Sequence, residues 1–97
     1  MKIIYPGGEL NLEEHFAKNA STVTMGRGED RDLVFRDHPD VSRHHAKIER
    51  VGKGLTLIDD GSTNGTFVNG DRIKRYDNLK HGDIIGFGAR LVLEVRT

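Results

Sequence analysis

Apolar residues recur at every second position along much of the chain. Ala46 and Ile48 alternate with Lys47 and Glu49, and the same period continues through residues 91–96. This spacing is typical of strands that bury one face. Turn-forming stretches separate such segments about every ten residues: Pro6-Gly7-Gly8, Asp37-His38-Pro39-Asp40, Gly52-Lys53-Gly54, Asp60-Gly61, Asn69-Gly70 and His81-Gly82-Asp83. The pattern predicts an all-β fold, an antiparallel sandwich or barrel.

One segment, LNLEEHFAKN at residues 10–19, also fits a helix, because Leu12 and Phe16 are four positions apart. Leu10, Leu12 and Glu14 fit a strand equally well. The following stretch, STVTMG, is rich in β-branched residues, which favour strands. We therefore expect a strand or a short irregular piece here.

Length and composition exclude several classes of protein. The 97 residues suit a single domain over residues 1–97, which could be a module excised from a longer protein. Fifteen Lys and Arg balance fifteen Asp and Glu, so charge favours neither nucleic acid nor a membrane as partner. The absence of Cys excludes disulfides and a thiol nucleophile. With no membrane span or signal peptide, the expected location is the cytoplasm, or the nucleus in a eukaryote.

Arg27 stands between two glycines in TMGRGED, residues 24–30, where a strand from Thr22 runs into a loop. The glycines free the backbone to bend while one guanidinium is presented. That group is a planar fork suited to two oxygens of a phosphate or carboxylate. A solvated arginine at the end of a strand is the alternative interpretation.

Two adjacent histidines in VSRHHAKIE, residues 41–49, raise the hypothesis of a metal site with His38 or Asp40. Neighbouring side chains on a strand point to opposite faces, so His44 and His45 would diverge. We expect no metal site. One histidine should pack inward as a hydrogen-bonding brace while the other faces water.

Ser42 and His45 could also be a nucleophile and its base, with Asp59 or Asp60 behind them. No strained nucleophile elbow or other supporting motif accompanies them. We expect the chain not to be an enzyme and to need no cofactor.

The stretch DDGSTNGTFVNG, residues 59–70, contains two Asn-Gly pairs. Asn69-Gly70 lies between two short β-like runs and is the plausible hairpin turn. Asn64-Gly65 then belongs to the preceding loop, where Ser62, Thr63 and Asn64 offer hydroxyl and amide donors. Flanking glycines would let successive backbone N–H groups converge on an anion, as in a nest. Such donors without a base or metal indicate recognition of an anion rather than turnover.

These residues resemble the forkhead-associated (FHA) domain family, which recognises phosphothreonine. The resemblance rests on Gly26-Arg27, on Ser42-Arg43-His44-His45-Ala46 and on the block from Ser62 to Gly70, in the family's order. The later LKHGDIIGFG, residues 79–88, is similar to the family's Leu-x-x-Gly-Asp-x-Ile segment. The resemblance implies a β-sandwich of about eleven strands, FHA/SMAD-like, with binding loops at one end.

The resemblance also implies roles for individual residues. The phosphate would be bound by Arg27 and Ser42, supported by Arg43 and Thr63. Asn64 would hydrogen-bond the peptide backbone. Gly26, His45 and Gly65 would support the loops. The partner would be a phosphothreonine-containing protein or peptide made by an upstream Ser/Thr kinase.

Family members also read the residue three positions after the phosphothreonine, often through the loop before the Ser-Arg motif. Here that loop is FRDHPDV, residues 35–41, in which Arg36 and Asp40 are the candidate specificity residues. The mixed charge of this loop does not indicate a clear preference for acidic peptides. Asp40 would disfavour an acidic residue at the third position after the phosphothreonine. The alternative function is an interaction or oligomerisation module of the same fold that works without phosphate.

Overall fold

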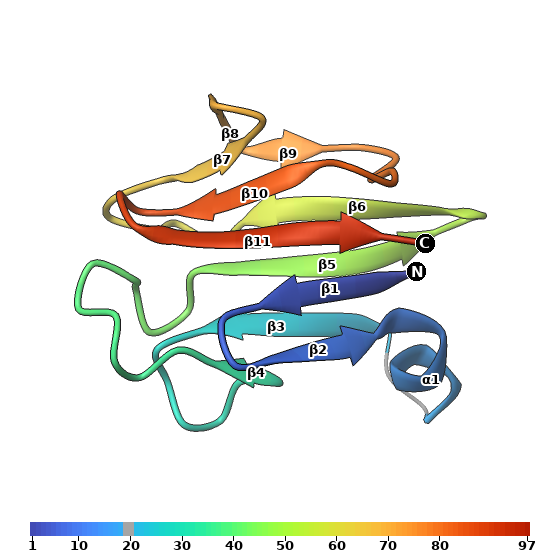
Figure 1. The fold of residues 1–97 in the computed structure, drawn as a ribbon, viewed down its shortest axis with the longest axis horizontal. Helices are drawn as coiled ribbons and strands as arrows, with labels where there is room; N and C mark the ends of the chain where they lie inside the picture. The colour runs from blue at the N-terminus through green and yellow to red at the C-terminus, as the bar shows by residue number, and fades with distance from the viewer. Residues whose placement is uncertain (19–20) are drawn as a thin grey trace.

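Two β-sheets enclose a single hydrophobic core (Figure 1). The structure is a computed structural model that describes residues 1–18 and 21–97. The six-stranded sheet has the order β2 (Gly8–Asn11), β1 (Lys2–Tyr5), β11 (Leu91–Arg96), β10 (Ile84–Phe87), β7 (Thr66–Val68) and β8 (Asp71–Ile73). The five-stranded sheet has the order β4 (Leu33–Val34), β3 (Thr22–Gly26), β5 (Ala46–Val51), β6 (Gly54–Asp59) and β9 (Arg75–Tyr76).

The period of two explains which side chains form the core. In β11, Leu91, Leu93 and Val95 are buried while Val92 is exposed. The predicted sandwich of about eleven strands is therefore confirmed, and eleven strands are present in the described residues. In both ranges, 1–18 and 21–97, no helix has the length and apolar character needed to cross a bilayer.

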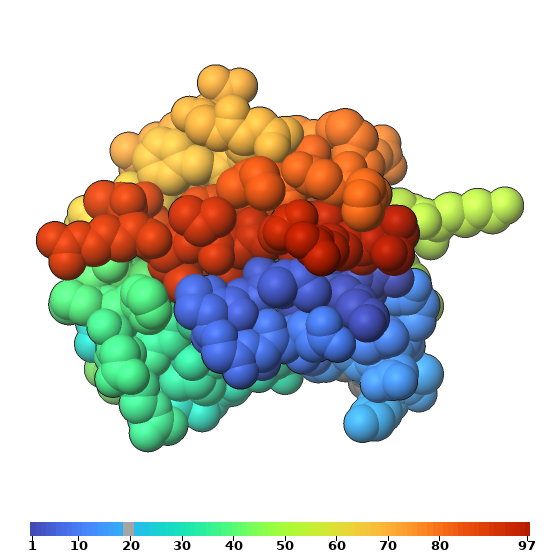
Figure 2. Space-filling model, viewed as in Figure 1, coloured from blue at the N-terminus to red at the C-terminus, as the bar shows by residue number. Residues whose placement is uncertain are grey.

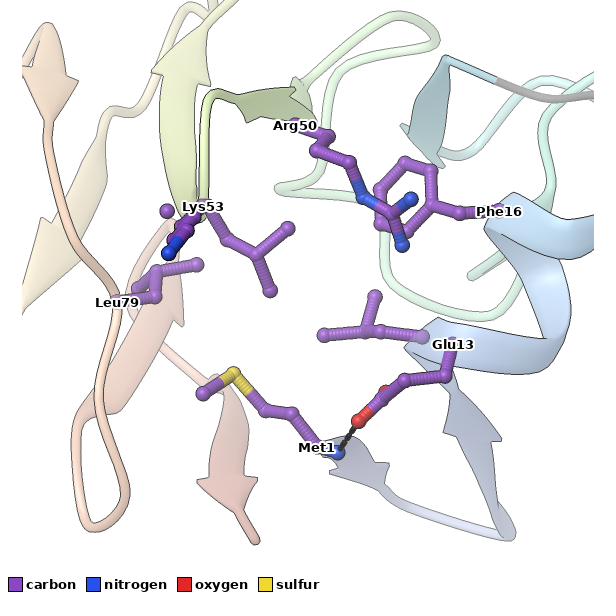
Figure 3. Close-up of a pocket in the computed structure, with 9 residues that line it drawn as sticks. Met1, Glu13, Phe16, Arg50, Lys53 and Leu79 are labelled. Atoms are coloured by element: carbon purple, nitrogen blue, oxygen red, sulfur yellow. Dashed lines mark hydrogen bonds and ion pairs between the residues drawn. The ribbon is translucent and has the colours of Figure 1, made fainter.

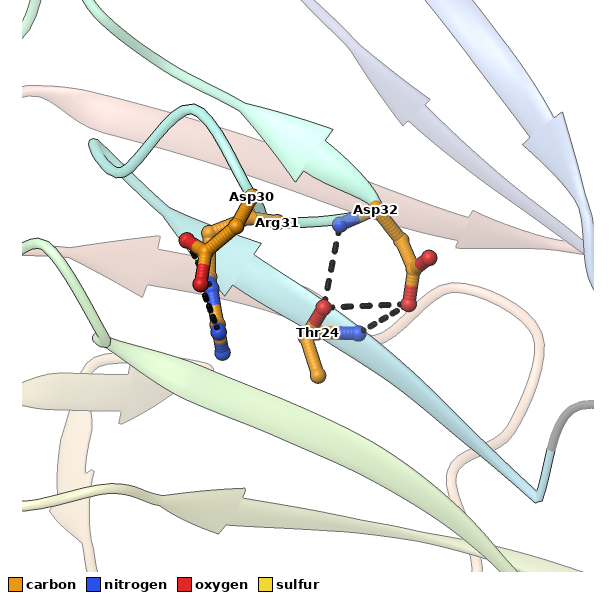
Figure 4. Close-up of polar contacts among 4 residues, drawn as sticks. All are labelled: Thr24, Asp30, Arg31 and Asp32. Atoms are coloured by element: carbon orange, nitrogen blue, oxygen red, sulfur yellow. Dashed lines mark hydrogen bonds and ion pairs between the residues drawn. The ribbon is translucent and has the colours of Figure 1, made fainter.

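One pair of strands departs from the expected antiparallel arrangement. β4 runs parallel to β3, with Met25 opposite Leu33. The cause is a set of reciprocal hydrogen bonds across the connecting loop (Figure 4). The Asp32 carboxylate accepts from the Thr24 amide at 2.8 Å and from its hydroxyl at 3.0 Å, and the Asp32 amide donates to that hydroxyl at 3.0 Å. These bonds hold the start of β4 beside β3.

The expectation of a strand or irregular piece over residues 10–19 is wrong in its middle part. β2 ends at Asn11, and a helix, α1 (Leu12–Ala17), follows. The Asn11 side chain caps this helix by accepting from the Glu14 amide at 3.0 Å. Leu12 and Phe16, one turn apart, are both buried. The last residue of the segment, Asn19, and the adjacent Ala20 lie outside the described residues.

The hairpin predicted at Asn69-Gly70 is present between β7 and β8. Both turn residues have positive φ, 51° and 90°, as such a two-residue turn requires. The Asn69 side chain also donates to buried Asp83 at 3.0 Å and accepts from the Ile84 amide at 2.9 Å. Asp83 thereby ties the Gly-Asp motif near the last strands to this hairpin.

Four connections gather at the end of the sandwich opposite α1 and the two termini (Figure 1). They are the β3–β4, β4–β5, β6–β7 and β10–β11 connections. Figure 2 shows the β4–β5 connection in green and the β10–β11 turn in orange-red along that edge of the surface. Hydrogen bonds join the β6–β7 and β10–β11 connections, where the Gly88 amide donates to the Gly65 carbonyl at 3.0 Å.

The cap of α1 makes a separable contribution to stability. Replacing Asn11 by Ala should lower the free energy of unfolding by about 0.5–2 kcal/mol, because the Glu14 amide loses its partner. Urea unfolding would measure the loss. Lys53→Ala, in an exposed turn, is the control and should change little. An unchanged unfolding free energy for the Asn11 variant would contradict the role of the cap.

Candidate functional site

The end of β3 lies unusually close to the backbone that precedes β5. The Arg27 amide donates to the Ser42 carbonyl at 2.9 Å, and the Gly28 amide donates to the Arg43 carbonyl at 3.1 Å. A Cβ atom on Gly26 would lie 2.2 Å from the Arg43 carbonyl oxygen, far inside van der Waals contact. Only glycine at position 26 allows this approach, which places Arg27 beside Ser42.

The Arg27 side chain is exposed but fixed in direction. Its Nε donates to the Val41 carbonyl at 2.9 Å. Its two terminal Nη groups make no hydrogen bond or ion pair within residues 1–18 and 21–97. One edge of the guanidinium is thus anchored, and the other is available to an anion.

Ser42 links this arginine to the β6–β7 loop. Its Oγ accepts from the Thr63 amide at 3.0 Å, so the hydroxyl proton remains free to donate elsewhere. Ser42 is half-buried, whereas Arg43 and Thr63 are exposed. The structure therefore brings Arg27, Ser42 and Thr63 together from three different connections. Arg43 joins them only through its backbone carbonyl, which accepts from the Gly28 amide.

His45 is fully buried and holds the two loops together, while His44 is exposed, as predicted for this pair. The Nδ1 of His45 accepts from the Ser42 amide at 3.0 Å. The proton of the neutral ring is therefore on Nε2, which donates to the Gly65 carbonyl at 2.9 Å. Burial lowers the pKa of His45, although the Gly65 carbonyl and the charge of Asp59 act in the opposite direction.

Both ring nitrogens of His45 are bound to backbone groups. This contradicts the alternative in which His45 is the base for a Ser42 nucleophile. Neither nitrogen contacts the Ser42 hydroxyl, and the Asp59 carboxylate binds Ser62 and Thr66 instead of the imidazole. The serine–histidine–aspartate arrangement is therefore not formed. Within the described residues, no three His, Asp or Glu side chains are grouped to hold a metal ion.

The β6–β7 loop forms a turn held by its own side chains and does not present the converging free amides of a nest. The Ser62 amide donates to the Asp59 carboxylate at 3.2 Å, and the Gly65 amide donates to Ser62 Oγ at 3.1 Å. With the Thr63 amide bound to Ser42, three of the loop's N–H groups are already used. Ser62 Oγ also donates to Asp59, so it faces the protein and is not available to a ligand.

Asp59 fixes the conformation of this loop, a role that was not predicted from the sequence. It accepts from the Ser62 amide and hydroxyl and from the Thr66 hydroxyl, the last at 2.6 Å. Burial acts to raise the pKa of Asp59, but these hydrogen bonds outweigh it and lower the pKa below its usual range. Asp favours turns because its side chain can accept from nearby backbone N–H groups, and this preference is the signal that could have revealed the role.

Asn64 and the candidate specificity residues are also fixed by contacts. The Asn64 side-chain amide donates to the Asp40 carbonyl at 2.8 Å, which leaves its Oδ1 free. The Asp40 carboxylate accepts from the Ala89 amide at 2.9 Å, a bond that lowers the pKa of Asp40. Arg36 pairs with Glu29 at 2.9 Å. The Asp40 carboxylate thus braces the β10–β11 turn.

A broad hollow of about 570 Å³ adjoins the site and is lined by Gly28, Glu29, Asp30, Arg43 and His44. It includes Arg43 but not the other three predicted phosphate-binding residues. A smaller hollow of about 220 Å³ contains none of the predicted site residues, and Figure 3 shows Met1, Glu13, Phe16, Arg50, Lys53 and Leu79 around it. There the Arg50 guanidinium lies 4.6 Å from the centre of the Phe16 ring.

Comparison with known proteins gives consistent results. The family model for the FHA domain matches residues 23–88. A DNA damage response protein kinase of Saccharomyces cerevisiae is 34% identical over 93 residues, 88% of this chain and 17% of the kinase. An oxoglutarate dehydrogenase inhibitor of Corynebacterium jeikeium is 40% identical over 83 residues, 84% of this chain and 56% of the inhibitor. The chain thus spans only part of each relative.

A solved structure from work on phosphothreonine-dependent FHA domain interactions is similar over nearly its whole length. The TM-score is 0.82 at 29% sequence identity, and the match covers 99% of this chain and 94% of that chain.

The close approach at Gly26 can be tested by adding one methyl group. Gly26→Ala should destabilise the domain by about 1–3 kcal/mol or displace the Ser42-Arg43 backbone, because backbone atoms occupy the space of the new Cβ. Gly86→Ala is the matched control, since its Cβ would meet Phe67 at an ordinary 3.5 Å. Thermal unfolding of both variants measures the difference. Equal stability of the two would contradict the argument.

The buried neutral state of His45 predicts a pH dependence. Because its pKa is lower in the folded than in the unfolded protein, its contribution to stability is complete above about pH 6.5. That contribution is lost as the pH falls from there through the folded pKa. Unfolding free energies between pH 7 and 5 should decline in the parent and in His44→Gln. The decline should be smaller in His45→Gln, and identical slopes in both variants would disprove the assignment.

Proposed function

The chain belongs to the FHA domain family, and from this we propose that it binds phosphothreonine-containing segments of partner proteins that Ser/Thr kinases have modified. The observation that carries the proposal is the guanidinium of Arg27, anchored on the Val41 carbonyl, together with the hydroxyl of the next residue, Ser42. The Val41 carbonyl and the Thr63 amide hold these two groups from behind. Their remaining donors make no hydrogen bond to the described residues of the protein, so no internal acceptor competes for them.

A phosphate ester suits this donor set. It carries a charge of about −1.5 to −2 at neutral pH and has three acceptor oxygens. Each charge-assisted hydrogen bond contributes roughly 1.5–3 kcal/mol. In the proposal the two Nη groups of Arg27 and the hydroxyl of Ser42 bind the phosphate directly. Arg43 and Thr63, both exposed at the same rim, complete the shell.

Asn64 is proposed to bind the backbone of the partner segment beside the phosphothreonine. Because its Nδ2 is held by the Asp40 carbonyl, its Oδ1 is directed and free to accept a peptide N–H. Gly26, His45 and Gly65 are proposed as supports, since they set the distance between the loops. We further propose that residues 1–97 constitute one domain.

Binding without turnover is the activity proposed for this chain. His45, the residue considered as a base for Ser42, has both nitrogens bound to backbone groups. The protein kinase relative extends far beyond the match, which covers 17% of its length, so its catalytic activity is not transferred to this chain.

Arg27 is the decisive residue for a test. Arg27→Ala should lower affinity for a phosphothreonine peptide by at least about 100-fold, since it removes two charge-assisted hydrogen bonds. The fold should survive because the side chain is exposed. Arg96→Ala, which removes the same charge from the C-terminal end of β11, is the matched control and should bind normally. Calorimetry with phosphorylated and unphosphorylated peptides measures both.

Two outcomes would contradict the proposal. One is equal affinity of the parent for phosphorylated and unphosphorylated peptides. The other is unchanged phosphopeptide affinity in a folded Arg27→Ala variant. Partner binding that survives Arg27→Ala would instead support a module of this fold that works without phosphate.

A further inference from the structure

Arg72 reaches from a neighbouring strand onto the β6–β7 loop. It lies on β8 opposite Phe67 of β7. A Cβ built on Gly65 would be 2.9 Å from Arg72 Nε, 3.1 Å from Arg72 Cζ and 3.1 Å from the Phe67 ring. The guanidinium therefore occupies the space above Gly65, immediately beside Asn64.

The position of Arg72 is not explained by a bond to the loop beneath it. The Gly65 amide donates to Ser62, and its carbonyl accepts from His45 and from the Gly88 amide. Gly65 has a φ of 96° and no side chain, so it offers a flat surface and no acceptor that is still free of a partner. The arginine rests on this surface through packing.

Arg72 also has no anionic partner in the described residues, in contrast to Arg31 and Arg36. Arg31 pairs with Asp30 at 2.9 Å (Figure 4), and Arg36 pairs with Glu29 at the same distance. Arg72 is exposed, and no carboxylate lies within 4 Å of it in residues 1–18 and 21–97. The Arg72 guanidinium is thus positioned by packing on Gly65, and no carboxylate of the described residues neutralises its charge.

We propose that Arg72 is a specificity residue that binds an acidic side chain, Asp or Glu, flanking the phosphothreonine of the partner segment. The inference rests on the proposed function. If Asn64 binds the backbone beside the phosphothreonine, a segment continuing past Asn64 reaches Gly65 and the guanidinium above it. A carboxylate at that point forms an ion pair with a group that needs no reorientation.

The test changes one charge in the peptide and one charge in the protein independently and measures the affinity of each combination. Phosphothreonine peptides with otherwise degenerate flanks carry Glu or Gln at one fixed position, and each of the four positions on either side is scanned. Affinities are measured by fluorescence anisotropy for the parent, Arg72→Gln, Arg72→Lys and Lys74→Gln. Lys74→Gln is the matched control, since it removes the same charge from an exposed residue two positions further along the chain.

At one position the parent should prefer Glu over Gln by about two- to fivefold, the range of an exposed ion pair. Arg72→Gln should abolish this preference while its affinity for the Gln peptides stays within about twofold of the parent. Lys74→Gln should retain the preference and Arg72→Lys part of it. Raising the salt concentration should reduce it.

Three results would overturn the inference. They are equal affinity for Glu and Gln peptides at every position in the parent, a preference that survives in Arg72→Gln, and an equal loss of affinity for all peptides in Arg72→Gln. The last result would mean that Arg72 only packs on Gly65 and supports the loop. Failure of the parent to bind any phosphothreonine peptide would instead contradict the proposed function itself, a distinct outcome.

Discussion

The geometry of the site depends on one buried, neutral imidazole. His45 accepts from the Ser42 amide and donates to the Gly65 carbonyl, so a single ring sets the separation of two loops that are twenty residues apart in sequence. The ring packs against Phe87, with centroids 4.5 Å apart, and so connects the loops to the core. Only the tautomer with the proton on Nε2 satisfies both contacts.

Around this ring, short polar side chains replace regular sheet pairing. The loops run past the ends of the strands, where the ladder hydrogen bonds stop, and their backbone groups still need partners. Asp59, Ser42 and Asn64 satisfy those groups with side-chain donors and acceptors. The same residue types that give the sequence its motifs therefore build the loops first. Only the atoms left over, such as the Nη groups of Arg27, are available for recognition.

Local patterns in the sequence were sufficient for most of the fold. The period of two located the strands, and Asn69-Gly70 located its hairpin because the signal lies within two residues. The helix at Leu12–Ala17 was missed because six residues give too little periodicity to outweigh strand-like neighbours. The parallel β4 was missed because it follows from side-chain bonds between Thr24 and Asp32, which no local pattern encodes.

The grouping of the candidate site residues could be predicted, but the partners of their individual donors could not. The order of the motifs grouped Arg27, Ser42 and Thr63. It could not show that the Thr63 amide already donates a hydrogen bond to the Ser42 hydroxyl oxygen. The contacts of Asp40 with Ala89 and of Asn64 with Asp40 join distant segments. Such contacts depend on how the sheets bring loops together, so they appear only in three dimensions.

The bond between Arg27 Nε and the Val41 carbonyl has a consequence for how a ligand associates. A free arginine side chain loses up to about 2 kcal/mol of rotamer entropy when it is immobilised, and here folding has already restricted that side chain. Capture of a ligand should therefore need little rearrangement of the protein. Differences in affinity among ligands would then arise mainly from how long each complex lasts, with encounter rates remaining similar.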